Sequence, residues 1–289
     1  MVKQCLGGCA AVVASLIAFS LFQGCGANPN ATDHTGKGGV AAVHPPVIGI
    51  GQIVEGVERQ PWLHLEVFQM ALPIGAVSRS DEFWKHVEET RLDPATYDLL
   101  LKNGVRVGVA PNDDWDYFRD ILELNHAQST KGVATANGGG TVELSMKRAV
   151  PVEDIFYLDD IGALHGRTYE KCDNLLSVSF WPEPRHPGEV LLTVSPTIRS
   201  LRSYYQFSSR NNDEGEIKEV RPEYLYDLNL RIVIPPESFL VIAPSRDSKW
   251  SSTLGNTFFH IDGKSEPLEQ VLILAPHVGS RIGPTASAR

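Results

Sequence analysis

Apolar and polar residues alternate over residues 62–72, which is the period of a β-strand. Two helical patterns follow, and each begins at a residue suited to an N-cap, Ser80 in the first and Asp93 in the second. Asn103-Gly104 ends the second helix, because glycine takes the left-handed conformation readily. A strand over 105–109 and a third helix capped by Asn112 or Asp113 complete a predicted β-α-α-β-α module over residues 61–125.

Beyond Gly140 the pattern changes to short apolar stretches separated by proline and glycine. It predicts strands at 141–145, 154–158, 175–181, 190–194, 204–208, 225–234, 239–243, 257–261 and 269–274. Short strands with turns between them favour antiparallel pairing, so residues 141–278 are predicted to form a mainly β domain. The predicted fold class is therefore α+β, a small β-α-α-β-α module followed by a mainly antiparallel β domain, with a linker over residues 126–140.

The first 25 residues have the order of a secretory signal, with a cation at Lys3, an apolar run over residues 10–22 and a small residue before Cys25. The apolar run is shorter than the roughly 20 residues that cross a bilayer, which disfavours a transmembrane anchor. With Gly24 before Cys25, the segment resembles a bacterial lipoprotein signal, in which a peptidase cuts before the cysteine and its thiol carries diacylglycerol. Phe22 and Gln23 depart from the family pattern of a leucine and a small residue.

This resemblance implies that residues 1–24 are a signal peptide and that Cys25 is the lipid-attachment residue. Acyl chains such as palmitate on Cys25 would anchor the protein to the membrane of the cell envelope, facing the periplasm or the exterior. A plain secretory signal without lipid is the alternative. Residues 25–60, rich in Asn, Gly, Thr, His and Pro, are predicted to be a flexible tether, and residues 279–289 a disordered tail.

Cysteine usage agrees with this arrangement. Cys5 and Cys9 would leave with the signal and Cys25 would carry lipid, so Cys172 is the remaining thiol and no internal disulfide is predicted. Cys172 is expected to be a small buried hydrophobe, because Lys171 alone does not make the basic, exposed setting of a nucleophile.

Charge excludes some partner classes. The formal charge of the 289 residues is −9, and it becomes −10 when Lys3 is lost with the signal. An acidic chain lacks the basic footprint on which nucleic-acid binding depends, so no nucleic-acid partner is predicted. The acidic excess also disfavours adhesion to anionic lipid by surface charge, and is expected to serve solubility.

No strong catalytic, phosphate-binding or zinc motif occurs in the sequence, and no cofactor or metal is predicted. Residues 112–116 (Asn-Asp-Asp-Trp-Asp) suit either a calcium site or a helix start with a negative first turn, and the helix start explains every residue. The pairs Glu153-Asp154 and Asp159-Asp160 suit either acid/base chemistry or charges that flank an apolar strand.

Histidine, serine and aromatic residues leave two further interpretations open. One of the histidines would have to meet Ser195 or Ser245 and an aspartate in space to form a catalytic triad, and these histidines are His126, His165, His186, His260 and His277. The aromatic residues suit either a ligand groove or core packing, and the most notable are Trp62, Trp84, Tyr204, Tyr205, Tyr224 and Tyr226.

The C-terminal strands carry a second resemblance. Residues 190–198, which end in Pro196-Thr197-Ile198, resemble the strand and turn of the bacterial secretin core. Residues 239–243, Leu254-Gly255, Phe258-Phe259 and 269–278 then follow in a similar order. Secretins build homo-oligomeric rings in the outer membrane, so the resemblance implies protein partners that include further copies of this chain.

Together these observations predict a non-enzymatic cell-envelope lipoprotein that acts as a binding, scaffold or assembly component, with secretin-like strands. The alternative is a secreted hydrolase whose catalytic site is assembled in space.

Overall fold

The computed structural model describes residues 61–124, 128–208, 213–263 and 266–279, all of which belong to one unit. The predicted signal peptide, tether and lipid-attachment residue Cys25 lie outside the described residues, as do His126 and the C-terminal tail after Gly279. Side chains are described except those of residues 122, 128 and 202–218.

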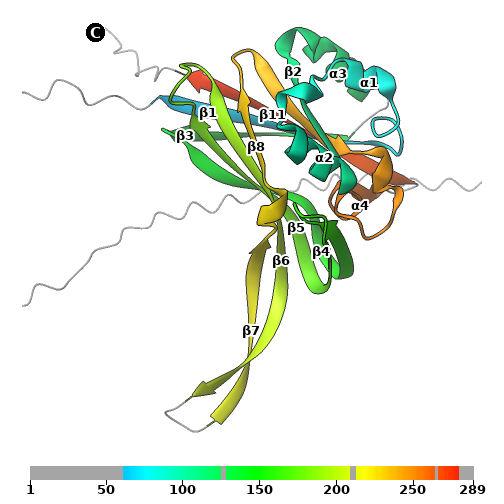
Figure 1. The fold of residues 1–289 in the computed structure, drawn as a ribbon, viewed down its shortest axis with the longest axis vertical. Helices are drawn as coiled ribbons and strands as arrows, with labels where there is room; N and C mark the ends of the chain where they lie inside the picture. Colours follow the sequence, from blue (N-terminus) through cyan, green and yellow to red (C-terminus); the bar gives the residue numbers. More distant parts are fainter. Residues whose placement is uncertain (1–60, 125–127, 209–212, 264–265, 280–289) are drawn as a thin grey trace, which may run out of the picture. The chain divides into compact units, whose positions relative to one another are not determined.

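Sheet A is antiparallel and combines strands from both ends of the described chain (Figure 1). In spatial order its strands are β2 (Val105–Pro111), β9 (Ser238–Pro244), β11 (Pro267–Gly279), β1 (Trp62–Pro73) and β3 (Gln128–Asn137), and β10 (His260–Asp262) pairs with β11.

Sheet B is also antiparallel, and it contains the three longest strands among the described residues. In spatial order they are β4 (Gly140–Leu158), β5 (Leu164–Pro182), β6 (Val190–Ser208) and β7 (Asp213–Tyr224), and β8 (Leu230–Ile234) pairs with the first part of β6. The α+β fold class with mainly antiparallel strands is therefore confirmed.

Short helices connect the strands. They are α1 (Asp81–Lys85), η1 (Glu89–Arg91), α2 (Pro94–Lys102), η2 (Asn112–Asp114), α3 (Trp115–Leu124), η3 (Tyr226–Leu228), η4 (Arg246–Lys249) and α4 (Leu254–Phe259), where η denotes a 3-10 helix. Two predicted N-caps are confirmed, because the Ser80 hydroxyl accepts a hydrogen bond from the Phe83 amide and the Asp93 carboxylate accepts one from the Thr96 amide. Gly104 has φ +81°, as its predicted role at the end of α2 requires.

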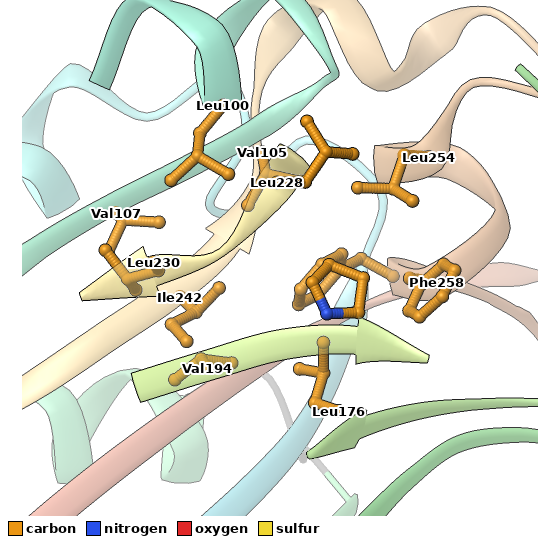
Figure 2. Close-up of a pocket in the computed structure, with 12 residues that line it drawn as sticks. Leu100, Val105, Val107, Leu176, Val194, Leu228, Leu230, Ile242, Leu254 and Phe258 are labelled. Atoms are coloured by element: carbon orange, nitrogen blue, oxygen red, sulfur yellow. The ribbon is translucent and has the colours of Figure 1, made fainter. Parts of the chain in front are cut away.

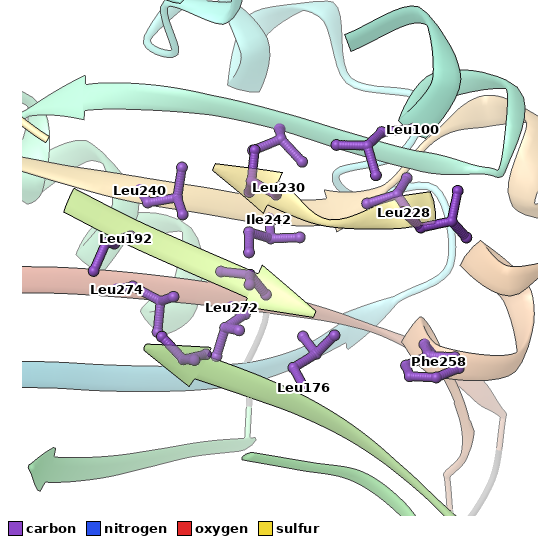
Figure 3. Close-up of a cluster of buried hydrophobic side chains, with 14 of the residues drawn as sticks. Leu100, Leu176, Leu192, Leu228, Leu230, Leu240, Ile242, Phe258, Leu272 and Leu274 are labelled. Atoms are coloured by element: carbon purple, nitrogen blue, oxygen red, sulfur yellow. The ribbon is translucent and has the colours of Figure 1, made fainter. Parts of the chain in front are cut away.

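Sheet A is buried on both faces. Strand alternation sends Leu240 and Ile242 of β9 toward sheet B, and the intervening Val241 toward the helices. Figure 3 shows the core between the sheets, where Leu272 and Leu274 of β11 lie close to Leu192 of β6. A second core, which includes Phe83 and Phe118, packs α1 and α3 on the other face of sheet A.

The strands of the predicted N-terminal module are part of sheet A. β1 pairs with β11 from Trp62–Gly279 to Pro73–Leu268, and β2 pairs with β9. Residues 128–137, which lie in the predicted linker, form the edge strand β3. The two predicted domains are thus joined by main-chain pairing between distant parts of the chain.

Some predicted strands were wrong in detail. Residues 254–259 form α4, because the Thr253 hydroxyl caps the helix and Leu254 and Phe258 bury one face of it at helical spacing. Only residues 260–262 of that region are extended. In the predicted strand 225–234, η3 precedes β8, and β7 was not predicted at all.

The outer part of β6 extends beyond its pairing with β5. β5 pairs with β6 only as far as Arg199, and beyond that residue the described partner of β6 is β7, from Ser200–Arg221 to Ser208–Asp213. Figure 1 shows this pair of strands extending away from both sheets. We call residues 200–208 and 213–221 the ribbon.

Candidate functional site

The strongest chemical arrangement in the described residues joins Ser248 of η4 to His260 of β10. The Ser248 Oγ atom lies 3.3 Å from His260 Nε2. Asn256 of α4 completes the group, with its Nδ2 atom 2.7 Å from His260 Nδ1. We call these three residues the Ser-His-Asn cluster.

The hydrogen bonds of the cluster run in the direction opposite to that of a catalytic triad. The Asn256 amide nitrogen is a donor, so His260 Nδ1 accepts and Nε2 carries the proton. The Ser248 hydroxyl donates to the Ser245 carbonyl oxygen at 2.7 Å and accepts from His260. A general base must instead accept the serine proton. Because Ser248 is also only 2% exposed, the cluster serves to tie η4 to α4 and β10.

Burial favours the neutral form of His260, and the two nearby charges act in opposite directions. Burial lowers the pKa of His260, the nearby Lys147 lowers it further, and the Glu269 carboxylate offsets part of the decrease. Glu269 is fully buried opposite His260 in the β10–β11 pair. Its Oε1 atom accepts hydrogen bonds from the Val77 and Ser78 amides, which fixes the segment before α1.

His260 therefore makes stability depend on pH. Its pKa in the folded protein lies below the ordinary value of 6.5, so the unfolded chain binds more protons as the pH falls through that value. We expect the free energy of unfolding to decrease by roughly 1 kcal/mol or less between pH 7 and pH 5 through this residue. Urea unfolding of His260→Gln should show a weaker pH dependence over that interval than the parent protein. An unchanged dependence would contradict this assignment.

The predicted carboxylate pairs do not form acid/base sites. Glu153 Oε1 lies 3.0 Å from Lys147 Nζ, and Glu153 Oε2 accepts a hydrogen bond from the Asn174 amide. Asp154 instead accepts a hydrogen bond from the Thr168 hydroxyl. Adjacent strand residues point to opposite faces, so Glu153 and Asp154 cannot share a proton.

Burial raises the pKa of the nearby Cys172 thiol to about 11, with a further contribution from Glu153, so Cys172 is the buried hydrophobe that was predicted.

Asp159 has a local role in the turn between β4 and β5. One of its oxygens accepts hydrogen bonds from the Ile161 and Ala163 amides, and the other lies 2.8 Å from His165 Nε2. The hydrogen bond to His165 is the main cause that holds the pKa of the Asp159 carboxyl below its ordinary value. Asp160 is exposed beside it. The Asp159–His165 pair thus stabilises the turn.

The other residues considered for a calcium site or a catalytic triad lie in different parts of the fold. Asn112–Asp114 form η2, which has an acidic first turn and leads into α3, and Asp114 Oδ1 lies 3.4 Å from His86 Nδ1. The predicted cap by Asn112 or Asp113 is not found at η2, because Pro111 takes the N-cap position without a side-chain cap hydrogen bond and the Asn112 amide donates to Glu237. Ser195 is buried on β6, and the Ser245 hydroxyl caps η4. His186 lies near Glu189, and His277 is on β11 opposite His64.

Among the aromatic residues considered for a ligand groove, Trp84 packs in the core, whereas Tyr224 and Tyr226 are exposed. Trp84 is buried beneath the Arg106 guanidinium, whose carbon lies 4.2 Å from the ring centre, and the Tyr224 and Tyr226 rings stack. Trp62, at the start of β1, is partly buried. The side chains of Tyr204 and Tyr205 lie outside the described part.

A cavity of about 20 Å³ lies in the core between the sheets, and Figure 2 shows the side chains that line it. It is lined by apolar side chains, among them Leu176, Val194 and Phe258. A space of this size holds about one water molecule, and without polar partners it stays dry. It is too small for a metabolite.

Comparison with protein-family models, with curated proteins and with solved structures finds no match for this chain. Among the described residues, no three His, Cys, Asp or Glu side chains are grouped to hold a metal ion. Within the same ranges, no helix has both the length and the apolar character needed to cross a bilayer.

Proposed function

We propose that this protein is a non-enzymatic cell-envelope lipoprotein, anchored through lipid on Cys25, that acts as a binding, scaffold or assembly component. The ribbon is the observation that carries the proposal. It presents main-chain edges to a partner, while the polar residues considered for catalysis are committed to hydrogen bonds that hold the fold together.

The ribbon has the properties of an assembly element. An isolated pair of strands is only marginally stable in water, and proteins usually cover or interrupt exposed strand edges. In the described residues, each ribbon strand is paired on one side only. A third strand supplied by a partner would satisfy one of these edges and stabilise the ribbon.

A second copy of the chain suits the two edges. From Ser200 to Ser208 the sequence has one arginine and no carboxylate, whereas from Asp213 to Arg221 it has four carboxylates and two cations. Pairing the β6 edge of one copy with the β7 edge of the next joins strands of opposite charge. Such a head-to-tail contact generates a closed ring or an open filament, and the secretin-like strand order favours the ring.

Shortening the ribbon is expected to abolish self-association. Leu201 and Val220 are paired in register, so residues 202–219 can be replaced by Asn-Gly as a two-residue turn. We expect sedimentation to show oligomers for the mature chain in detergent and monomers for the shortened chain. The unfolding midpoint in urea should be retained, because the ribbon extends away from both sheets (Figure 1). A parent protein that is monomeric at high concentration would refute the homo-oligomer.

Replacing Cys25 is expected to remove the lipid. Cells that express Cys25→Ser should incorporate no labelled palmitate into the protein, and the matched Cys172→Ser variant should be labelled like the parent, because that thiol is buried. The mass of the mature N-terminus gives a second measurement. Labelling of Cys25→Ser, or a parent protein without label, would favour a plain secretory signal.

The second candidate is a secreted hydrolase, and the contact between Ser248 and His260 is the observation that favours it. A fluorophosphonate probe decides between the two functions. Covalent labelling of Ser248 that His260→Gln abolishes would support the hydrolase and contradict the non-enzymatic proposal.

A further inference from the structure

Two histidines lie opposite each other where the first and last described strands meet. β1 begins beside the end of β11 (Figure 1), and the register of this antiparallel pair places His64 opposite His277. Residues in such a pair point to the same face of a sheet, with their Cβ atoms about 5 Å apart. Both histidines are partly buried, so the sheet positions them while solvent still reaches them.

The two histidines are on the face of sheet A that the helices cover farther along. Met70 of β1 and Val271 of β11 point to the same face and belong to the core that packs α1 and α3. His64 and His277 lie six residues away from that pair, toward the end of the two strands. Their end of the face is therefore accessible to a ligand from solvent.

Contacts on two sides fix the direction of the His64 ring. Its Nδ1 atom lies 3.1 Å from Thr135 Oγ1 on β3. On the other side, a Cβ atom built on Gly279 would lie 3.1 Å from His64 Cδ2 and Nε2. The Nε2 edge of the ring thus faces β11, the strand that carries His277, and the missing side chain at Gly279 leaves room beside it.

The hydrogen bonding leaves ring nitrogens available on both histidines. In the described part of the chain, neither His64 Nε2 nor the His277 ring has a hydrogen-bond or ion-pair partner. When Thr135 Oγ1 accepts the Nδ1 proton of His64, the lone pair of that ring is on Nε2. A hydrogen bond from the second ring nitrogen is also what orients most histidines that bind metal ions.

We propose that His64 and His277 form a surface site for a divalent transition metal ion of the zinc and copper class. Neutral imidazole is a ligand for both ions. Two nitrogens on one zinc ion lie roughly 3 Å apart, since each Zn–N bond is about 2.0–2.1 Å. Rings on Cβ atoms about 5 Å apart can bring their nitrogens to that separation. The site goes beyond the function proposed above and depends on neither the lipid nor the ribbon.

The remaining coordination positions of the ion would be filled by water. Glu66, the next residue of β1 on this face, is paired with Lys131 Nζ at 3.1 Å. Among the described residues no group of three His, Cys, Asp or Glu side chains is suited to a metal ion, so the site has two protein ligands. A structural zinc site has four. We therefore expect reversible binding of an ion that folding does not require.

Calorimetric titration of the mature chain with Zn²⁺ tests the site. We expect saturable binding of one ion per chain, tighter binding of Cu²⁺, and no comparable binding of Mg²⁺, which prefers oxygen ligands. His64→Gln and His277→Gln should each weaken Zn²⁺ binding by about tenfold or more, because loss of even an outer partner of a ligand has that effect. The matched control His186→Gln, which removes an exposed histidine between β5 and β6, should bind like the parent.

A double variant separates one shared site from two independent ones. When both rings bind the same ion, removal of the second histidine has little further effect, so the variant with both replacements should bind about as weakly as either single variant. Additive losses would show two separate sites and contradict the proposal.

Chemical modification tests the parent protein without a substitution. Diethyl pyrocarbonate acylates accessible histidines, and mass spectrometry locates the products. Zn²⁺ should protect His64 and His277 while His186 still reacts. Equal reaction of all three with and without Zn²⁺, no saturable binding at millimolar Zn²⁺, or histidine variants that bind like the parent would overturn the proposal.

Discussion

Gly255→Ala is expected to destabilise the protein by roughly 3 kcal/mol, near the upper end for forcing an extra methyl group into a packed site. A Cβ atom at Gly255 would lie 2.1 Å from the Gly104 carbonyl oxygen and 2.4 Å from its carbon. Both are main-chain atoms, so no side-chain rotation relieves the contact. Urea unfolding followed by circular dichroism should show a large decrease in the midpoint.

The main chain at this contact has little freedom to move. The Gly255 amide donates to the Asn103 carbonyl oxygen at 2.9 Å, and the Ser245 amide donates to the Gly104 carbonyl oxygen at 2.8 Å. The end of α2, the start of α4 and the start of η4 therefore meet at one point. Moving the chain apart to admit a methyl group would strain or break these hydrogen bonds.

Gly132→Ala is the matched control. A Cβ atom on this β3 residue would meet no atom within 4 Å. The same chemical change should therefore alter the free energy of unfolding by less than about 1 kcal/mol, and reduced freedom of the unfolded chain favours a small gain. Equal losses in the two variants would show that the close approach at Gly255 is not what limits stability.

The local parts of the fold were predictable from the sequence. Ser80 and Asp93 cap helices as expected, since a cap depends on residues three positions away. Pairing of β1 with β11 was not predictable in this way, because it joins Trp62 to Gly279 and no local pattern specifies the partner. β3 resembles a linker in sequence since it is an edge strand whose exposed residues alternate with small ones such as Ala134 and Ala136.

In the candidate site, too, individual residues were predictable from the sequence, whereas their contacts across the fold were not. His260 and Ser245 were among the predicted residues, but the serine that contacts His260 is Ser248. The contact depends on α4, which returns the chain toward η4 and whose last three residues were predicted as part of a strand. The direction of the hydrogen bonds depends on Asn256, and no pattern in the sequence marks that residue as the partner of a histidine. His260 was therefore a predicted candidate, but its serine partner differs from the predicted one and its role is structural.

Phe258→Ala is expected to destabilise the protein by about 3–5 kcal/mol, as loss of a buried aromatic side chain does in well-packed cores. Phe258 is fully buried and lines the small cavity between the sheets (Figure 2), so little surrounding structure can collapse into the vacated volume. The matched control is Phe156→Ala, because Phe156 is 43% exposed and its loss should cost no more than about 1 kcal/mol. Urea unfolding measures both.

A small apolar ligand distinguishes a vacated core from general disruption in Phe258→Ala. An apolar cavity of sufficient size stays dry and binds benzene, and a ligand that binds only the folded state raises the unfolding midpoint in proportion to the logarithm of its concentration. The parent cavity of about 20 Å³ admits no such ligand, so benzene should leave the parent unchanged and raise the midpoint of Phe258→Ala. If the variant loses stability without a response to benzene, the two sheets have closed over the gap. In that case the core between the sheets, which includes Leu176, Val194 and Ile242, adapts to the loss of the ring.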